Sequence, residues 1–445
     1  MGTPKIPESI ITQAWQSLWG RELATRQGNY IQIVYPGRAS GNSGPDFHDA
    51  VIATEGGRLA KGDIEIHVKS SQWRAHGHHL DPGYNRVILH VVMWDDSRMP
   101  TTLQNGEIAP VLALDDYLKG QVEEVCRWAS QPALSTEPCH GVIDKFGAKT
   151  TGQLLDAAGE ERFRAKVALF EKGLTSEEAG QVLYQGVMGA LGYTKNKKPF
   201  QELARRLPLC ILESSAPSKI EASPAMQQAL LLGTAGLLPS QRRGKGKEEK
   251  WVTELEEQWH YWGKAGAMTE ASWHFIGVRP YNFPTRRIAA ASYLLARYRE
   301  KGLLEGALHL LKKAHQNGNR RLEEGLIASD HGYWAEHFDF GVRGATSSAL
   351  LGRDRAAELA VNVILPFAIA WGKSDSQPEL MRMSYQLYRS YRRLAENGVT
   401  HHMTKQIFPQ GGHRAINSAR RQQGLIHIYE CLCTEGRCNA CPLGC

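Results

Sequence analysis

The chain has 445 residues, a formal net charge of +7, 42% hydrophobic residues and 44 glycines that follow no collagen-type period. This composition excludes a small disulfide-stapled scaffold, a disordered chain and a fibrous protein. The longest apolar runs, such as residues 360–371, are too short to span a bilayer, and the first ten residues lack the pattern of a signal peptide. We therefore expect a cytoplasmic protein without membrane segments.

The first 125 residues alternate between helical and strand patterns. Apolar side chains at helical spacing predict an amphipathic helix over residues 6–19. Apolar runs that end at turn residues predict strands over residues 30–35, 45–55, 58–71 and 86–94. The third strand places four polar side chains on one face, namely Asp63, Glu65, His67 and Lys69. A histidine-rich irregular crossover precedes the last strand, which is apolar on both faces.

The region from 151 to 430 is different in kind, because Ala, Leu, Glu, Arg and Gln recur there at helical period. It predicts an all-helical domain of about ten helices. We expect a linker over residues 126–150. We also expect a loop over residues 240–250, because that segment contains no apolar residue. The predicted fold class is therefore mixed α+β, with an α/β core first and a helical region after it.

Charge is distributed unevenly along the chain. The first 120 residues hold 11 Lys and Arg against 13 Asp and Glu, and the remaining 325 hold 42 against 33. A basic helical region is expected to bind nucleic acid, although a solvated basic surface explains the same balance. Arginines there recur with aromatic residues, a combination that can hold phosphates and stack bases. The residues are Arg286, Arg287, Arg389, Arg392, Arg393, Arg420 and Arg421, with Trp262, Tyr281, Phe283 and Tyr391.

Two carboxylates and a lysine in the first domain suit metal-assisted phosphodiester hydrolysis. Asp46 and Glu65 would hold Mg²⁺ or Mn²⁺ through oxygen ligands, and the metal would polarise the phosphate and acidify its bound water. Lys69 would steady the attacking hydroxide or the charge at phosphorus. His67 would be an accessory ligand.

These residues resemble the PD-(D/E)xK nuclease superfamily in the pair Pro45–Asp46, in the strand GDIEIHVKSS and in the order of elements around them. The resemblance implies a restriction-endonuclease-like core of order α-β-β-β-α-β within residues 1–125. It also implies a nuclease, acting on DNA rather than RNA, in repair, recombination or phage defence. The superfamily places its acid two residues before the lysine, where this chain has His67. We prefer Lys69 as the lysine with Glu65 as a displaced acid; the alternative puts His67 in the place of the lysine.

Nearly the whole chain also resembles an uncharacterised bacterial family, a domain of unknown function, through blocks such as GPDF, IEIHVKSSQW and RQQGLIHIYECLC. This resemblance implies no activity. Two other functions stay open. One is a non-catalytic nucleic-acid-binding scaffold with a relic nuclease core, which the displaced acid favours. The other is a zinc-dependent hydrolase that uses the histidines near the site.

Those histidines are His76, His78, His79 and His90. The first three would be either metal ligands or loop residues that orient Asp81 and Tyr84, and we expect the second role. His90 lies within an apolar strand, where a hydrogen-bonded core histidine is expected.

Five of the eight cysteines fall in the last fifteen residues: Cys431, Cys433, Cys438, Cys441 and Cys445. In a cytosolic chain such a cluster indicates a metal site before it indicates disulfides. Residues 431–445 therefore predict a metal-binding tail that holds a 4Fe-4S cluster or structural zinc, with Cys139 and His140 as further contributors. Thiols on a frayed tail are the alternative.

Overall fold

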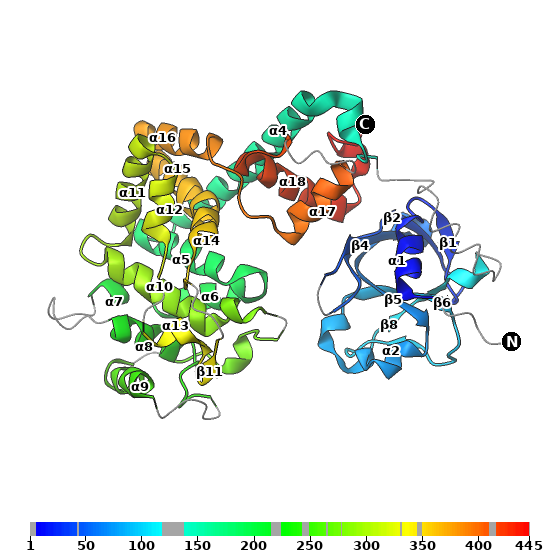
Figure 1. Cartoon of the computed structure of the whole chain (residues 1–445), viewed down its shortest axis with the longest axis horizontal. Coiled ribbons are helices and arrows are strands. Elements are labelled where there is room, and N and C mark those ends of the chain that lie inside the picture. Colours follow the sequence, from blue (N-terminus) through cyan, green and yellow to red (C-terminus); the bar gives the residue numbers. More distant parts are fainter. Residues whose placement is uncertain are drawn as a thin grey trace. The chain divides into compact units, whose positions relative to one another are not determined.

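The computed structural model describes residues 6–41, 44–117, 138–214, 224–242, 249–263, 266–276, 278–329, 332–344, 349–408 and 415–444. The chain forms two compact units (Figure 1). The first contains the residues up to 159 together with 396–417 and 421–445, and the second contains 160–395 and 418–420. The predicted fold class is confirmed: a mixed sheet comes first, a large helical region follows, and the chain ends in the cysteine-rich tail.

The first unit is built on a seven-stranded sheet of order β1-β2-β4-β5-β6-β9, with β3 paired to β4. The strands are β1 (Glu22–Ala24), β2 (Tyr30–Tyr35), β3 (Arg38–Ala39), β4 (Phe47–Thr54), β5 (Leu59–Lys69), β6 (Val87–Trp94) and β9 (Val111–Ala113). Strands β2, β4 and β5 are antiparallel neighbours, whereas β6 runs parallel to β5 and β9 parallel to β6. The four strands predicted from the sequence are confirmed, and β1, β3 and β9 are added to them.

The crossover that joins the parallel strands β5 and β6 is mostly irregular. It holds one short helix, α2 (Gln72–Ala75), followed by the 3-10 turns His78–Leu80 and Pro82–Tyr84. Gly77 has a φ of 76° and Pro82 lacks an amide proton, so a longer helix cannot form here. The expected order α-β-β-β-α-β is thus present with its second helix reduced to one turn. Beyond β6, β7 (Thr101–Thr102) and β8 (Ile108–Ala109) form a small hairpin.

Helix α1 (Glu8–Gln16) covers one face of this sheet. Ile11 and Trp15 are fully buried against Ile64 and Ile66 of β5, which lie in the same core. Because side chains alternate along a strand, this packing leaves Asp63, Glu65 and His67 on the opposite face. The apolar and polar faces of β5 are therefore separated as its sequence predicts.

The opposite face is covered along β2 and β4 by the end of the chain. Helix α17 (Gly398–Ile407), helix α18 (Ala419–Cys431) and the start of α4 (Val142–Leu174) share a core with Tyr35 and Val51 of the sheet. Residues 396–417 and 421–430 therefore belong to the first unit, whereas the sequence predicts a helical domain over 151–430. Of the expected linker, 126–137 lies outside the described residues, and the chain is helical from Val142.

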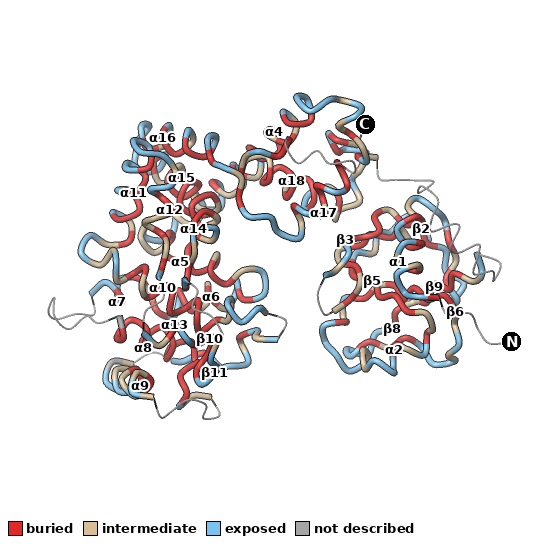
Figure 2. The backbone as a smooth tube through the Cα atoms, viewed as in Figure 1, coloured by how far each residue is buried: buried red, intermediate tan, exposed pale blue. Residues whose placement is uncertain are grey.

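In its described residues, the second unit consists of helices and connecting loops with one small hairpin, formed by β10 (His337–Asp339) and β11 (Val342–Arg343). Its helices after α4 are α5 (Ala179–Leu191), α6 (Tyr193–Arg206), α7 (Leu209–Ser214), α8 (Pro224–Thr234), α9 (Lys250–Trp262), α10 (Pro284–Tyr298), α11 (Leu303–Asn317), α12 (Arg320–Leu326), α13 (Tyr333–Glu336), α14 (Arg353–Leu359), α15 (Leu365–Ser374) and α16 (Pro378–Arg389). Figure 2 shows buried residues concentrated where these helices meet, along one extended apolar core. Most of the expected loop 240–250 lies outside the described residues.

One continuous helical stretch in the described part of the chain, Arg353–Ser374, is long and apolar enough to cross a membrane. It joins α14 and α15 through a π-helical turn over Ala360–Ile364, so it is longer than its apolar run suggests. Its apolar window is 72% buried inside the structure. That burial is typical of the core helix of a soluble protein.

Candidate metal centre

Asp46 and Glu65 lie side by side on the polar face of the sheet. The amide of Ile66 donates to Oδ2 of Asp46 at 2.9 Å, and the amide of Asp46 donates to Oε2 of Glu65 at 3.3 Å. Each carboxylate is thus tied to the backbone of the strand or loop that carries the other. Two hydrogen bonds hold both acids in place before any ligand binds.

The surroundings of the pair disfavour negative charge. Burial raises the pKa of Glu65 to about 7; the close approach of His78 opposes this, and the charge of Asp46 adds to it. Burial also raises the pKa of Asp46, against the hydrogen bond from Ile66 and the charge of His78. A metal cation between the two carboxylates would favour their ionised forms.

Glu8, the first residue of α1, lies in the same electrostatic region. Its pKa is raised by burial and by the charge of Asp46, and lowered by His76 and His78. Sequence reasoning missed this residue. The available signal was an acid in the first turn of the helix that precedes the strands.

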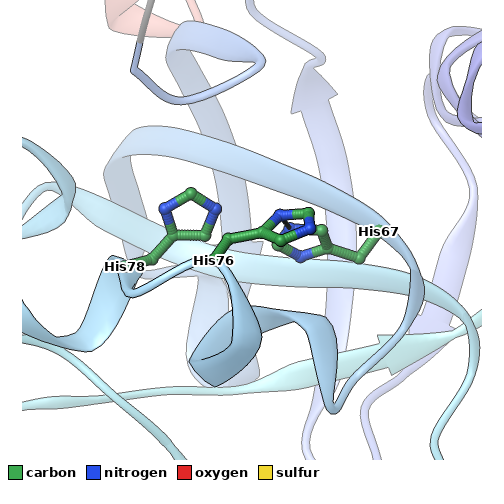
Figure 3. A group of neighbouring side chains, drawn as sticks. All are labelled: His67, His76 and His78. Carbon is green, nitrogen blue, oxygen red and sulfur yellow. Dashed lines mark hydrogen bonds between the residues drawn. The ribbon is translucent and has the colours of Figure 1, made fainter.

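Three histidines, His67, His76 and His78, gather together (Figure 3), and two of them lie close to Glu65. His67 comes from β5, while His76 and His78 come from the segment after α2, and their ligand atoms all lie within 4.8 Å of one another. Nε2 of His67 is 3.1 Å from Nδ1 of His76 and 3.6 Å from Oε1 of Glu65. Nε2 of His78 is 3.2 Å from the same oxygen. The two oxygens of Glu65 therefore face different donors: Oε1 faces the imidazoles and Oε2 faces Asp46.

Buried residues hold the rings of these histidines. Nδ1 of His67 lies 2.9 Å from Nε2 of His90, and Nδ1 of His90 lies 2.9 Å from Oγ1 of Thr101. Burial lowers the pKa of His67 to about 2 and that of His90, which is fully buried, to about 3. Both imidazoles are therefore neutral at neutral pH, and neutral imidazole is the form that binds metals.

Aromatic rings fix the position of His78. The ring of Tyr84 lies 4.0 Å from it and the buried ring of Trp73 lies 5.4 Å from it, measured between centroids. His78 thus contacts Tyr84, as expected from the sequence, and also faces Glu65. Asp81 caps the following turn by accepting a hydrogen bond from the amide of Gly83 at 2.7 Å.

Lys69 lies at the end of β5, and its ammonium group is 3.8 Å from Oδ2 of Asp96. Among the described residues, the contact of this ammonium group is with Asp96 and not with Asp46 or Glu65. The structure instead brings Asp46 and Glu65 together with His67. Of the two residues, His67 therefore lies nearer to Glu65 than Lys69 does.

The cysteine tail leaves α18 as two 3-10 turns, Cys433–Glu435 and Cys438–Ala440. Cys433 and Cys441 are buried in the core under β2 and β4, which also contains Cys139. Gly436 has a φ of 64°, and a Cβ on it would lie 2.9 Å from Cγ1 of Val34. Cys438 is half-buried, Cys431 is exposed, and Cys445 lies outside the described residues.

The arginines considered for nucleic-acid binding are largely engaged inside the protein. Arg286 and Arg287 are buried, and they donate to the backbone carbonyls of Trp334 and Leu350, respectively. Others form ion pairs within their own unit: Arg389 and Arg420 with Glu160, Arg392 with Glu323, and Arg421 with Asp156. These contacts stabilise the helical packing, while Arg389 and Arg392 keep about half of their side chains exposed. The side chain of Trp262 lies outside the described residues.

Comparisons with known proteins support the whole-chain resemblance alone. No curated protein and no solved structure matches the chain, and nothing in the comparisons supports the PD-(D/E)xK superfamily. The model of the family described as "Protein of unknown function (DUF2851)" matches residues 8–397. The match includes every residue of the candidate metal centre and ends before the cysteine tail. Because the family model matches most of the length of the chain, the chain belongs to the DUF2851 family.

Proposed function

We propose that this protein is a metal-dependent phosphodiesterase that hydrolyses nucleic acid, DNA rather than RNA. The observation that carries the proposal is the pair Asp46 and Glu65, held together by the amides of Ile66 and Asp46 at 2.9 and 3.3 Å. The order of elements around the pair supports it, because a helix, antiparallel strands and a crossover to a parallel strand also occur in PD-(D/E)xK nucleases.

The donor atoms fit a hard divalent cation. Carboxylate oxygens are the ligands that Mg²⁺ and Mn²⁺ prefer, and burial leaves both acids without the solvation that would stabilise their charge. Asp46 and Glu65 would hold the ion, with Glu8 adding negative potential from α1. When bound, the metal supplies polarisation of the phosphate and a more acidic water.

His67 replaces the cationic lysine of the superfamily pattern with a neutral ring. It cannot stabilise the charge at phosphorus as an ammonium group would, and its Nε2 instead offers a nitrogen lone pair beside Glu65. Its link through Nδ1 to His90 holds that nitrogen toward Glu65. Lys69, paired with Asp96, is then a residue near the edge of the site.

We propose a structural metal for the tail. Cys433 and Cys438 begin successive 3-10 turns and Cys441 follows the second, and thiolates suit zinc or a 4Fe-4S cluster. Such a tail fits the reducing cytoplasm. Visible absorption of protein purified without oxygen, with its iron and zinc content, distinguishes the two metals; a protein that contains neither contradicts the proposal.

The function is tested by incubating labelled single- and double-stranded DNA and RNA with the full chain in Mg²⁺, Mn²⁺ or EDTA. Wild type is compared with Asp46→Asn and with Asp116→Asn, an acid on the surface of the same unit. Metal-dependent cutting by wild type and Asp116→Asn, lost at least 100-fold in Asp46→Asn, is the expected result. Cutting by Asp46→Asn refutes the site. Tight nucleic-acid binding without cutting by any of the three identifies a scaffold instead.

A further inference from the structure

The histidines beside Glu65 form a donor set distinct from the carboxylate pair. We infer that His67, His76 and His78, with Oε1 of Glu65, form a second metal site, selective for a divalent transition metal such as Zn²⁺ or Co²⁺. Glu65 then bridges this ion and the ion at Asp46. This second site adds to the proposed function. It rests on that proposal only for the ion at Asp46.

The spacing of the donor atoms fits one ion. Zinc–nitrogen and zinc–oxygen bonds of about 2.0–2.1 Å place the ligands of a tetrahedral site roughly 3.3–3.4 Å apart. The measured separations are 3.1 Å from His67 to His76, 3.2 Å from His78 to Glu65, and 3.6 Å from His67 to Glu65. The three nitrogens are mutually within 4.8 Å, and the exposed side chain of His76 is free to turn toward the ion held by the other ligands.

The geometry at His78 favours a common ligand over a direct hydrogen bond. Its Nε2 is buried and lies 3.2 Å from Oε1 of Glu65, yet it makes no hydrogen bond of acceptable angle. A nitrogen and an oxygen that are close but do not point at each other can both point at a third atom. The rings of Tyr84 and Trp73 hold His78 in this orientation.

A buried chain behind His67 prepares its other nitrogen for a metal. If Nδ1 of His90 donates to Oγ1 of Thr101, then Nε2 of His90 accepts from Nδ1 of His67. The lone pair of His67 Nε2 is then directed toward His76 and Glu65. Metal-bound histidines are commonly oriented in this way by a partner on the second nitrogen.

The backbone between the other two histidines brings them to the same place. Gly77 adopts a φ of 76°, which turns the chain between His76 and His78. A Cβ on Gly77 would meet no atom within 4 Å, so the backbone conformation, and not the space, favours glycine here. The imidazoles select the metal, because nitrogen ligands suit zinc and other transition metals and Mg²⁺ prefers oxygen. Two ions bridged by one carboxylate can stabilise the attacking and leaving oxygens of a phosphodiester together.

The test measures metal bound to the full chain. Chelator-treated protein is titrated with Zn²⁺ and with Co²⁺, and bound metal per chain is counted by mass spectrometry after gel filtration. His76→Asn and His78→Asn are compared with wild type and with His79→Asn, a half-buried histidine of the same loop outside the group. Metal held by the cysteine tail is common to all four proteins and cancels in the differences.

We expect His76→Asn and His78→Asn to bind one metal equivalent fewer than wild type, or to bind it at least tenfold more weakly. His79→Asn should match wild type, and the visible bands of the Co²⁺ protein should change only in the first two variants. Equal stoichiometry and affinity in all four folded proteins would overturn the inference. Asp46→Asn separates the two proposals, because it should keep the metal at the histidines and lose hydrolysis. Hydrolysis by Asp46→Asn would refute the proposed function while leaving the metal count at the histidines to stand.

Discussion

Replacing Glu65 by Gln is predicted to stabilise the metal-free protein while abolishing its function. Burial raises the pKa of this carboxyl from 4.5 to about 7, so the folded state binds its proton more tightly than the unfolded state. The contribution of Glu65 to the free energy of unfolding is therefore greatest below pH 4.5 and is lost as the pH rises through 7. A shift of this size corresponds to about 3 kcal/mol of unfolding free energy lost at pH 8. The amide of Gln carries no charge and can still accept from the amide of Asp46, so the variant avoids that loss.

The assay is urea unfolding in EDTA at pH 8 and at pH 4, with the exposed Glu55→Gln as the matched control. Glu65→Gln should gain up to about 3 kcal/mol at pH 8 and nothing at pH 4, and Glu55→Gln should change neither. Added Mn²⁺ at 100 times its Kd should stabilise wild type by about 2.7 kcal/mol and leave Glu65→Gln unchanged. A variant less stable than wild type in EDTA at pH 8 would refute the reasoning.

Three further substitutions test the roles of Lys69, His402 and Tyr429. Lys69→Met should reduce cutting less than tenfold, against at least 100-fold for Asp46→Asn; equal losses would restore Lys69 to the catalytic site. Burial lowers the pKa of His402 to about 4, so its stabilising effect is complete above pH 6.5 and is lost as the pH falls to 4. Between pH 7 and 4, the free energy of urea unfolding should therefore fall by about 3 kcal/mol less in His402→Gln than in wild type. Equal falls in the two proteins would contradict this prediction. Tyr429→Phe removes the 2.8 Å hydrogen bond to Asp49 and should cost about 1–2 kcal/mol at pH 7; unchanged unfolding would show that the bond contributes nothing.

The elements that local patterns determine were predictable from the sequence. Strand β5 alternates Ile64 and Ile66 with Glu65 and His67, and this alternation alone assigns two faces. The helices of the second unit likewise follow from their apolar period. The pairing of Asp46 with Glu65 followed from their positions on adjacent strands.

Features that depend on long-range packing were not predictable. The sequence shows nothing local that sends α17 and α18 back to cover β2 and β4. The partners of three arginines lie more than 200 residues away, as Glu160 does from Arg389. The convergence of His76 and His78 on Glu65 depends on the irregular path of a short crossover, which periodicity does not describe.

The same limit explains the position of Lys69. Spacing along β5 places Lys69 on the correct face, but the register with Asp46 is set by the hydrogen bond from Ile66, and this puts His67 nearer to the acids. The sequence alone permits two alignments, with either Lys69 or His67 at the position of the lysine. The contact between strand and loop was needed to choose between them.

We propose that a metal held by Asp46 and Glu65 acts on the phosphate of a nucleic acid. The most direct measurement is cleavage of DNA that carries a sulfur in place of a non-bridging oxygen at the scissile phosphate, with Mg²⁺ and then with Mn²⁺. Because sulfur binds Mg²⁺ poorly and accepts softer metals, we predict that cutting of the substituted site is slow in Mg²⁺ and is restored by Mn²⁺. An equal loss of rate with both metals, or cutting that persists in EDTA, would contradict the account.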